Sequence, residues 1–249
     1  MKSEKDEIIY GIHAVEEAVA AGREISKVLI QQEYRGEGLT GLVKLLRKEA
    51  IPYQHLPKER MKRMPGRAQQ GVVAFISPIE FHDLQQLLPA LFEQGKMPLI
   101  AVLDGITDVR NIGAIARSAE CFGVHALVVA AKGTGAINAD AVKSSAGALL
   151  KVPVCREKNL SNAIHFMKQS GLMAIGAGED AKKPLQEAEL THPVVLVLGA
   201  EGKGIGKEIA GLLEDSIKIS MAGTIGSLNV SVAAGIIFHE AMHQRLKAE

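Results

Sequence analysis

The feature that most constrains this chain is a series of short apolar runs that alternate with helix-like stretches from Leu99 onward. Four of these runs are apolar at every position, namely Leu99–Leu103, Ala126–Ala130, Leu172–Ile175 and Val194–Leu198, and Ile217–Met221 follows as a fifth candidate strand. Continuous apolar runs are typical of strands buried on both faces, and helical connections between strands are typical of parallel sheets. The sequence therefore predicts an α/β domain in which helices cover both faces of a parallel sheet.

The first 75 residues predict a separate small α/β unit. Helical spacing of apolar residues marks 12–20 and 42–49, and apolar runs mark strands at 28–31 and 71–76. A connecting helix is expected around Leu84–Leu91, broken by Pro89 and ended by Gly95. We therefore expect a domain over residues 1–75, a linker over 76–96 and a larger domain over 97–249.

Composition indicates a globular protein without a nonspecific basic surface, because 47% of the residues are hydrophobic and the net charge is +1. Two cysteines, in contexts typical of a buried helix and a buried strand, and an N-terminus without a signal peptide favour the reducing cytoplasm. The apolar runs are too short to cross a membrane.

Basic charge is concentrated between Pro57 and Arg67, a segment that contains five positive side chains and one carboxylate. A Pro- and Gly-interrupted basic segment can contact nucleic-acid phosphates, although a solvated turn has the same composition. The candidate residues for such phosphate contacts are Lys58, Arg60, Lys62, Arg63 and Arg67.

Three motifs follow strand-like runs, where α/β proteins build ligand sites from loops. The first is Asp108-Val-Arg-Asn111 running on to Arg117, the second Gly199-Ala-Glu-Gly-Lys-Gly204 and the third Ser227-Leu-Asn-Val-Ser-Val-Ala233. Asn111 suits the N-cap of a helix that begins near Ile112, and Ser227 or Asn229 suits the N-cap of the last helix. Gly113 would leave space for a substrate, and Arg117 is a plausible partner for Glu201.

Two other patterns are weaker. The glycine-rich segment matches neither a dinucleotide fingerprint nor a phosphate-binding P-loop. His239-Glu-Ala-Met-His243 has the spacing of a zinc protease, but a third zinc ligand is needed and six residues remain, with Glu249 the sole candidate. We interpret that segment as an amphipathic terminal helix and expect no metal.

In order and wording the three motifs resemble those of the SpoU/TrmH-type RNA ribose methyltransferases, a branch of the SPOUT superfamily, over roughly residues 97–245. At lower specificity, the first 75 residues resemble the ribosomal-protein-like RNA-binding domain of the bacterial 23S rRNA guanosine-2′-O-methyltransferases. Family members often have Pro and His or Gln at the positions of Val109 and Arg110.

The resemblance implies a C-terminal trefoil knot and S-adenosylmethionine as the cofactor. By motif position, Gly199, Ile219, Met221 and Leu228, with Ser227 adjacent, would bind the cofactor. Arg117 would be the catalytic arginine and Glu201 would orient it. Asn111 and Asn229 would position ribose and phosphate, and Arg110 adds a possible phosphate contact.

The function expected from the resemblance is methylation of a guanosine 2′-OH in 23S rRNA by a homodimer. A tRNA-directed or adenosine-specific enzyme of the same family and a non-catalytic RNA-binding or ribosome-assembly factor are the alternatives. The last helix has more apolar and small residues than one face needs, so we expect Ile237 and Ala241 at the dimer interface.

Overall fold

The computed structural model describes residues 7–64, 71–135 and 137–248. It divides into two compact units. The smaller contains the chain up to Glu80 together with residues 137–139, and the larger contains Phe81–Gly135 and the chain from Asp140 onward. No helix of the described residues is long and apolar enough to cross a membrane.

The smaller unit is a four-stranded sheet in the order β1-β4-β2-β3, with one parallel pair, β2 and β3. Helices α1 and α2 pack on one face around Val15, Leu42 and Leu46, and α3 packs Met61 against the other face. The elements are β1 (Ile8–Tyr10), α1 (Ile12–Ala20), β2 (Ile25–Gln31), α2 (Leu39–Lys48), β3 (Tyr53–Leu56), α3 (Lys58–Lys62) and β4 (Val72–Ile76).

The larger unit is built on a seven-stranded sheet in the order β7-β6-β5-β10-β8-β11-β9, in which every pair is parallel. Its strands are β5 (Leu99–Asp104), β6 (Ala126–Ala130), β7 (Val154–Glu157), β8 (Met173–Ala177), β9 (Lys183–Pro184), β10 (Val194–Gly199) and β11 (Asp215–Lys218). Its helices are α4 (Leu84–Glu93), α5 (Val109–Cys121), α6 (Ala139–Ser144), α7 (Leu160–Gln169), α8 (Lys207–Ala210) and α9 (Val230–Ala248), with short 3₁₀ turns at Ala148–Leu150 and Leu185–Glu187.

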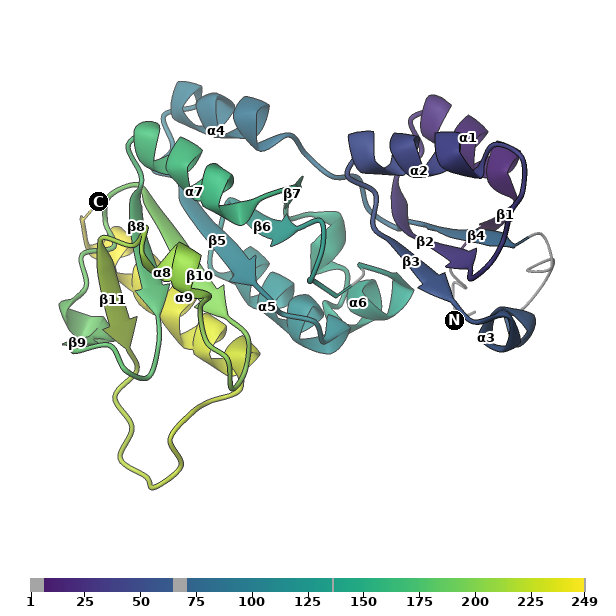
Figure 1. Ribbon diagram of the computed structural model, residues 1–249. Helices are drawn as coiled ribbons and strands as arrows, with labels where there is room; N and C mark the ends of the chain where they lie inside the picture. Colours follow the sequence, from purple (N-terminus) through teal and green to yellow (C-terminus); the bar gives the residue numbers. More distant parts are fainter. Residues whose placement is uncertain (1–6, 65–70, 136, 249) are drawn as a thin grey trace. The chain divides into compact units, whose positions relative to one another are not determined.

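Helices cover both faces of this sheet (Figure 1). On one face α4, α7 and α8 pack against Ile100, Val102 and their neighbours. The alternate residues Ala101 and Leu103 point to the other face and are also fully buried there, on the side of α5 and α9. The predicted parallel sheet with two covered faces is therefore confirmed, whereas the knot stays a prediction.

Three details differ from the sequence expectations. Helix α4 runs through Pro89 without a break and packs Leu84, Leu88 and Leu91 into the core of the larger unit. The strand expected at 217–221 lies at Asp215–Lys218 instead. Cys155 is buried as expected, but Cys121 is exposed at the end of α5.

The amino ends of β5 and β10 are joined to α9 by one arginine. Arg245 donates to the carbonyl oxygens of Leu190, Met97, Pro98 and His192. Nearby, the Nδ1 atom of His125 accepts a hydrogen bond from the Leu99 amide at 3.0 Å. Burial and the charges of Arg245 and Lys96 lower the pKa of His125 to about 4, so this imidazole is neutral in the folded protein at neutral pH.

Candidate active site

The first motif begins helix α5, and Asp108 rather than Asn111 is its N-cap. The Asp108 carboxylate accepts a hydrogen bond from the Arg110 amide at 2.8 Å, and the helix starts at Val109. The prediction that Asn111 caps a helix starting at Ile112 was wrong, because Asp108 already provides the cap one turn earlier. Asn111 therefore lies in the first helical turn, with its side chain available for other contacts.

Arg110 does not extend freely into solvent. Its guanidinium lies 2.9 Å from the Asp108 carboxylate in an exposed ion pair, and a second hydrogen bond joins the same two side chains at 3.2 Å. These hydrogen bonds lower the pKa of the Asp108 carboxyl, which is therefore ionised at neutral pH. A phosphate would have to compete with Asp108 for this arginine.

The second motif is a tight loop at the carboxyl end of β10. A Cβ at Gly199 would lie 2.2 Å from the backbone carbon of Gly204, so only glycine allows the loop to fold back at this distance. The Gly204 amide donates to the Ala200 carbonyl at 2.8 Å, and Gly202 and Gly204 both have positive φ. This loop holds Glu201 at the surface.

Asn111, Glu201 and Asn229 form one hydrogen-bonded cluster, although they come from three separate motifs. The Glu201 Oε1 atom accepts from Asn111 Nδ2 at 3.1 Å and from Asn229 Nδ2 at 2.5 Å. Asn229 Nδ2 also lies 3.1 Å from the Asn111 Oδ1 atom that accepts from it, so the three side chains close a triangle. The sequence predicted each of these residues but not their mutual contacts.

Asn229 has a second contact, because it is the N-cap of α9. Its Oδ1 atom accepts from the Ser231 amide at 2.9 Å, as expected for one of the two candidate caps. The Val230 amide also donates to Glu201 Oε1, at 3.3 Å. The start of α9 is thus tied to the glycine loop, which fixes the orientation of Asn229.

Arg117 lies apart from this triangle. It is exposed on α5, and within the described part of the chain it has no ion pair or hydrogen bond, so the expected contact with Glu201 is not formed. It is six residues after Asn111, which corresponds to about 9 Å along the helix axis and about 120° around it.

Gly113 of α5 is buried, and a Cβ there would lie 1.9 Å from Ser144 Oγ. It therefore does not leave the space for a substrate that the sequence suggested.

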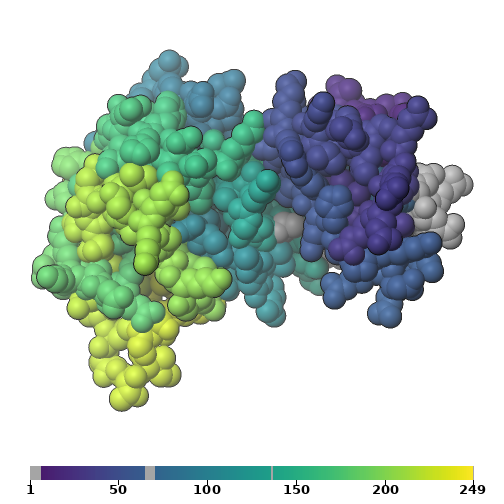
Figure 2. Space-filling model, viewed as in Figure 1, coloured from purple at the N-terminus to yellow at the C-terminus, as the bar shows by residue number. Residues whose placement is uncertain are grey.

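The remaining predicted cofactor residues lie on the segment that follows β11. Ile219 is partly buried, whereas Met221, Ser227 and Leu228 are exposed on a loop without regular secondary structure. Figures 1 and 2 show this loop leaving the body of the larger unit before the chain enters α9. The predicted cofactor residues thus lie on two loops. Gly199 lies on the tight loop after β10, and the other four lie on the protruding loop after β11.

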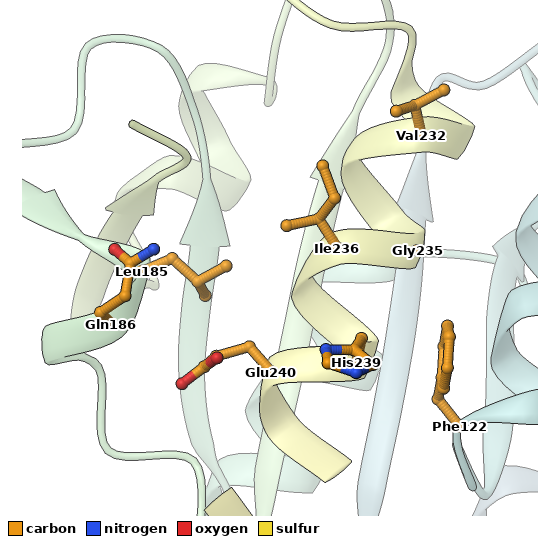
Figure 3. Close-up of a pocket in the computed structure, with 8 residues that line it drawn as sticks. All are labelled: Phe122, Leu185, Gln186, Val232, Gly235, Ile236, His239 and Glu240. Carbon is orange, nitrogen blue, oxygen red and sulfur yellow. The ribbon is translucent and has the colours of Figure 1, made fainter. Parts of the chain in front are cut away.

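An open apolar groove of about 400 Å³ lies along α9 (Figure 3). Val232 and Ile236 line it on one side, and Phe122, at the end of α5, lines it on another. Val232 is 50% exposed and Ile236 is 39% exposed. Ile237 and Ala241, which we expected at a dimer interface, are buried within the protomer, because they face the sheet rather than the groove.

His239 and His243 lie on the exposed side of α9 with parallel rings whose centroids are 6.2 Å apart. Neither they nor any other residues in the described ranges form a group of three or more side chains able to hold a metal ion.

The basic segment of the smaller unit forms α3. Lys58, Arg60, Lys62 and Arg63 are all exposed, while Met61 between them is buried and anchors the helix to the sheet. Lys62 lies 3.3 Å from Glu59, an exposed pair of little energetic weight. Arg67 lies outside the described residues.

One residue near the site was absent from the sequence predictions. Asp104 ends β5 beside Gly199 of β10, and its Oδ2 atom accepts a hydrogen bond from the Gly206 amide at 2.7 Å. The signal in the sequence was a single carboxylate directly after an apolar run, which does not identify a partner 102 residues away.

Comparison with known proteins accounts for both units. Residues 98–239 match the family model described as the SpoU rRNA Methylase family, and residues 8–82 match the model for RNA 2′-O ribose methyltransferase substrate binding. A TrmH family tRNA/rRNA methyltransferase from Staphylococcus saprophyticus is 32% identical over 238 residues and covers 96% of each chain. The corresponding protein YacO from Bacillus subtilis is 30% identical over 243 residues and covers 98% of each chain.

Solved structures of SpoU and TrmH enzymes are also similar to this chain. The SpoU methyltransferase AviRb from Streptomyces viridochromogenes, in complex with AdoMet, has a TM-score of 0.62 at 25% identity and aligns with 97% of this chain and 91% of its own. The TrmH/SpoU tRNA modifying enzyme of A. aeolicus has a TM-score of 0.56 at 30% identity, but covers 66% of this chain and 85% of its own.

Proposed function

The chain belongs to the SpoU rRNA methylase family of S-adenosylmethionine-dependent RNA methyltransferases, and we propose that it methylates the ribose 2′-OH of a guanosine in 23S rRNA. The observation that carries this proposal is the closed triangle of Asn111, Glu201 and Asn229 at the carboxyl ends of β5 and β10. It brings together one polar side chain from each of the three motifs.

The residues of the site fit the cofactor. At Gly202 and Gly204 a Cβ would have open space around it, so backbone groups there are accessible to a ligand. Met221 and Leu228 expose apolar side chains that can cover an adenosyl group. We propose that Gly199, Ile219, Met221, Ser227 and Leu228 hold S-adenosylmethionine, which when bound supplies a methyl group on a sulfonium.

Arg117 is the proposed catalytic residue. A ribose hydroxyl is a poor nucleophile at neutral pH, so the site must stabilise the negative charge that develops on its oxygen. The guanidinium is permanently charged, exposed and uncommitted, which suits this role better than that of a general base. Asn111 and Asn229, held by Glu201, would position ribose and phosphate so that the oxygen is aligned for attack.

A second protomer would complete the site. Arg117 is about 120° around α5 from Asn111, and α9, which packs against α5, carries the apolar groove with Val232 and Ile236 exposed. An isologous dimer that buries this groove would bring the arginine of one subunit towards the cofactor loops of the other. Val232 and Ile236 replace Ile237 and Ala241 as the proposed interface residues.

The smaller unit supports an rRNA substrate. We propose that Lys58, Arg60, Lys62, Arg63 and Arg67 bind RNA phosphates, with Arg110 as a further contact once Asp108 releases it. The tRNA modifying relative of 30% identity aligns with only 66% of this chain. The part of this chain without an aligned counterpart is therefore about as long as the smaller unit. The names of the full-length relatives include both tRNA and rRNA, so tRNA remains the second candidate substrate class. We propose that the enzyme works in the cytoplasm, where both RNAs are found.

Mass spectrometry of ribose methylation in rRNA and tRNA from a strain lacking this protein tests the proposal. We expect one 2′-O-methylguanosine to disappear from 23S rRNA and to return when the wild-type chain is supplied. Unchanged rRNA together with a lost tRNA methyl group would move the substrate to tRNA. Unchanged methylation of both RNAs would favour a non-catalytic RNA-binding role.

A further inference from the structure

Asp104 joins the two ends of the glycine loop. In the sheet it lies beside Gly199, the residue at which the loop leaves β10. Its side chain reaches the other end of the loop, where the Oδ2 atom accepts from the Gly206 amide at 2.7 Å. The donor–acceptor distance is that of a well-formed hydrogen bond, so this contact ties the far end of the loop to β5.

The loop is therefore a ring with little freedom. Inside it, the Gly204 amide donates to the Ala200 carbonyl at 2.8 Å, and the backbone at Gly204 folds directly over Gly199. A Cβ at Gly105, the residue after Asp104, would lie 3.6 Å from the Ala200 side chain, an ordinary packing distance. The turn that leads from β5 to α5 thus packs against the loop that follows β10.

The position of this ring determines the position of the polar triangle. Glu201 lies within the ring, and its Oε1 atom gathers Asn111 from α5 and Asn229 from the start of α9. A shift of the ring relative to β5 would move Glu201 away from Asn111. Asp104 is the side chain that fixes this distance, because it belongs to β5 and binds the far end of the ring.

We infer that Asp104 is a positioning residue that holds the Gly199–Gly206 loop in its cofactor-binding form, without touching cofactor or RNA itself. This inference rests on the proposed function, in which that loop contributes to the S-adenosylmethionine site. The role requires a hydrogen-bond acceptor at Asp104 rather than a negative charge. An asparagine can therefore replace it, whereas an alanine cannot.

The test compares Asp104→Ala and Asp104→Asn in the full-length protein. S-adenosylmethionine binding is measured by titration calorimetry without RNA, and KM for RNA and kcat are measured separately. Loss of this hydrogen bond predicts a rise of up to about tenfold in the cofactor Kd of Asp104→Ala, with a lower kcat. Asp104→Asn should stay within about threefold of wild type. KM for RNA should change less than the cofactor Kd, because most of the proposed phosphate contacts lie on α3, in the other unit.

Two further variants make the result decisive. Glu189→Ala removes an exposed carboxylate that contacts Thr191, just before the amino end of β10, and should leave all constants unchanged. Gly206→Ala places a Cβ 3.3 Å from Asp104 Oδ2 and should weaken cofactor binding even if Asp104→Ala does not fold. Thermal unfolding without cofactor identifies the variants that fold.

The outcomes separate the inference from the function on which it rests. If wild-type protein neither binds S-adenosylmethionine nor methylates RNA, the proposed function fails and the inference fails with it. If wild type is active but Asp104→Ala, or Gly206→Ala when Asp104→Ala does not fold, binds the cofactor equally well, the inference alone is wrong. An Asp104→Asn variant as impaired as Asp104→Ala would show that the charge matters, which also contradicts it.

Discussion

The triangle around Glu201 gives the sharpest mutational prediction, namely the effect of Glu201→Ala. Its Oε1 atom accepts two side-chain hydrogen bonds, from Asn111 and Asn229, and a longer one from the Val230 amide. A hydrogen bond to a charged group contributes about 1.5 kcal/mol at the low end of the usual range, which is appropriate at this exposed site. Loss of the two shorter bonds then costs about 3 kcal/mol of transition-state positioning, or a fall in kcat/KM of about 100-fold.

The assay is single-turnover transfer of a labelled methyl group to rRNA, with the melting temperature measured in parallel. Glu201→Gln keeps an acceptor oxygen and should lose less activity than Glu201→Ala. Glu93→Ala, which removes an exposed carboxylate at the end of α4, is the matched control and should behave as wild type. If Asn111 acts through Glu201, the effects of Asn111→Ala and Glu201→Ala should not add. Activity of Glu201→Ala within about threefold of wild type would refute the reasoning.

Four other predictions concern the arginine, the basic helix, the groove and the buried histidine. Arg117→Ala should abolish methyl transfer while leaving cofactor binding nearly intact by calorimetry, and near-wild-type turnover would exclude the assigned role. Neutralising several of Lys58, Arg60, Lys62 and Arg63 should raise KM for RNA and weaken its dependence on salt concentration. The slope of log affinity against log salt concentration should fall by roughly 0.7 to 0.9 for each RNA phosphate that the variant no longer neutralises. An unchanged slope would mean that α3 does not bind phosphates. Val232→Glu or Ile236→Glu should give folded, inactive monomers in sedimentation at micromolar concentration, whereas Ile237→Glu should unfold the protein because that side chain is buried. Because burial lowers the pKa of His125 to about 4, the unfolded state binds more protons below pH 6.5, so the free energy of unfolding should fall as pH decreases from 6.5 towards 4; chemical denaturation should show a weaker dependence in His125→Asn.

The fold of the larger unit was largely predictable because β5, β6 and β10 each contain five consecutive apolar residues. Such runs are typical of strands in a parallel sheet covered on both faces, and these three strands are buried on both faces. The strands that the sequence did not indicate are short or lie at the edges. β7 has only two apolar residues, Val154 and Cys155, and β9 contains two residues in all, so neither gives a periodic signal.

The candidate site was predictable in its members but not in its contacts. Asn111, Glu201 and Asn229 were found from motifs, yet they are separated by 90 and 28 residues and meet only through the sheet register. The partner proposed for Glu201 was wrong because the phase of α5 turns Arg117 away. The buried face of α9 was misjudged for a similar reason, since apolar residues such as Val232, Ile236 and Ile237 occur all around that helix.

The measurement that tests the account most directly is nucleoside mass spectrometry of 23S rRNA incubated with purified protein and S-adenosylmethionine labelled in its methyl group. We expect one labelled 2′-O-methylguanosine per rRNA molecule with wild-type protein and none with Arg117→Ala. A label on a base atom, or no transfer to rRNA or tRNA from the deletion strain, would contradict ribose 2′-O-methylation by this site.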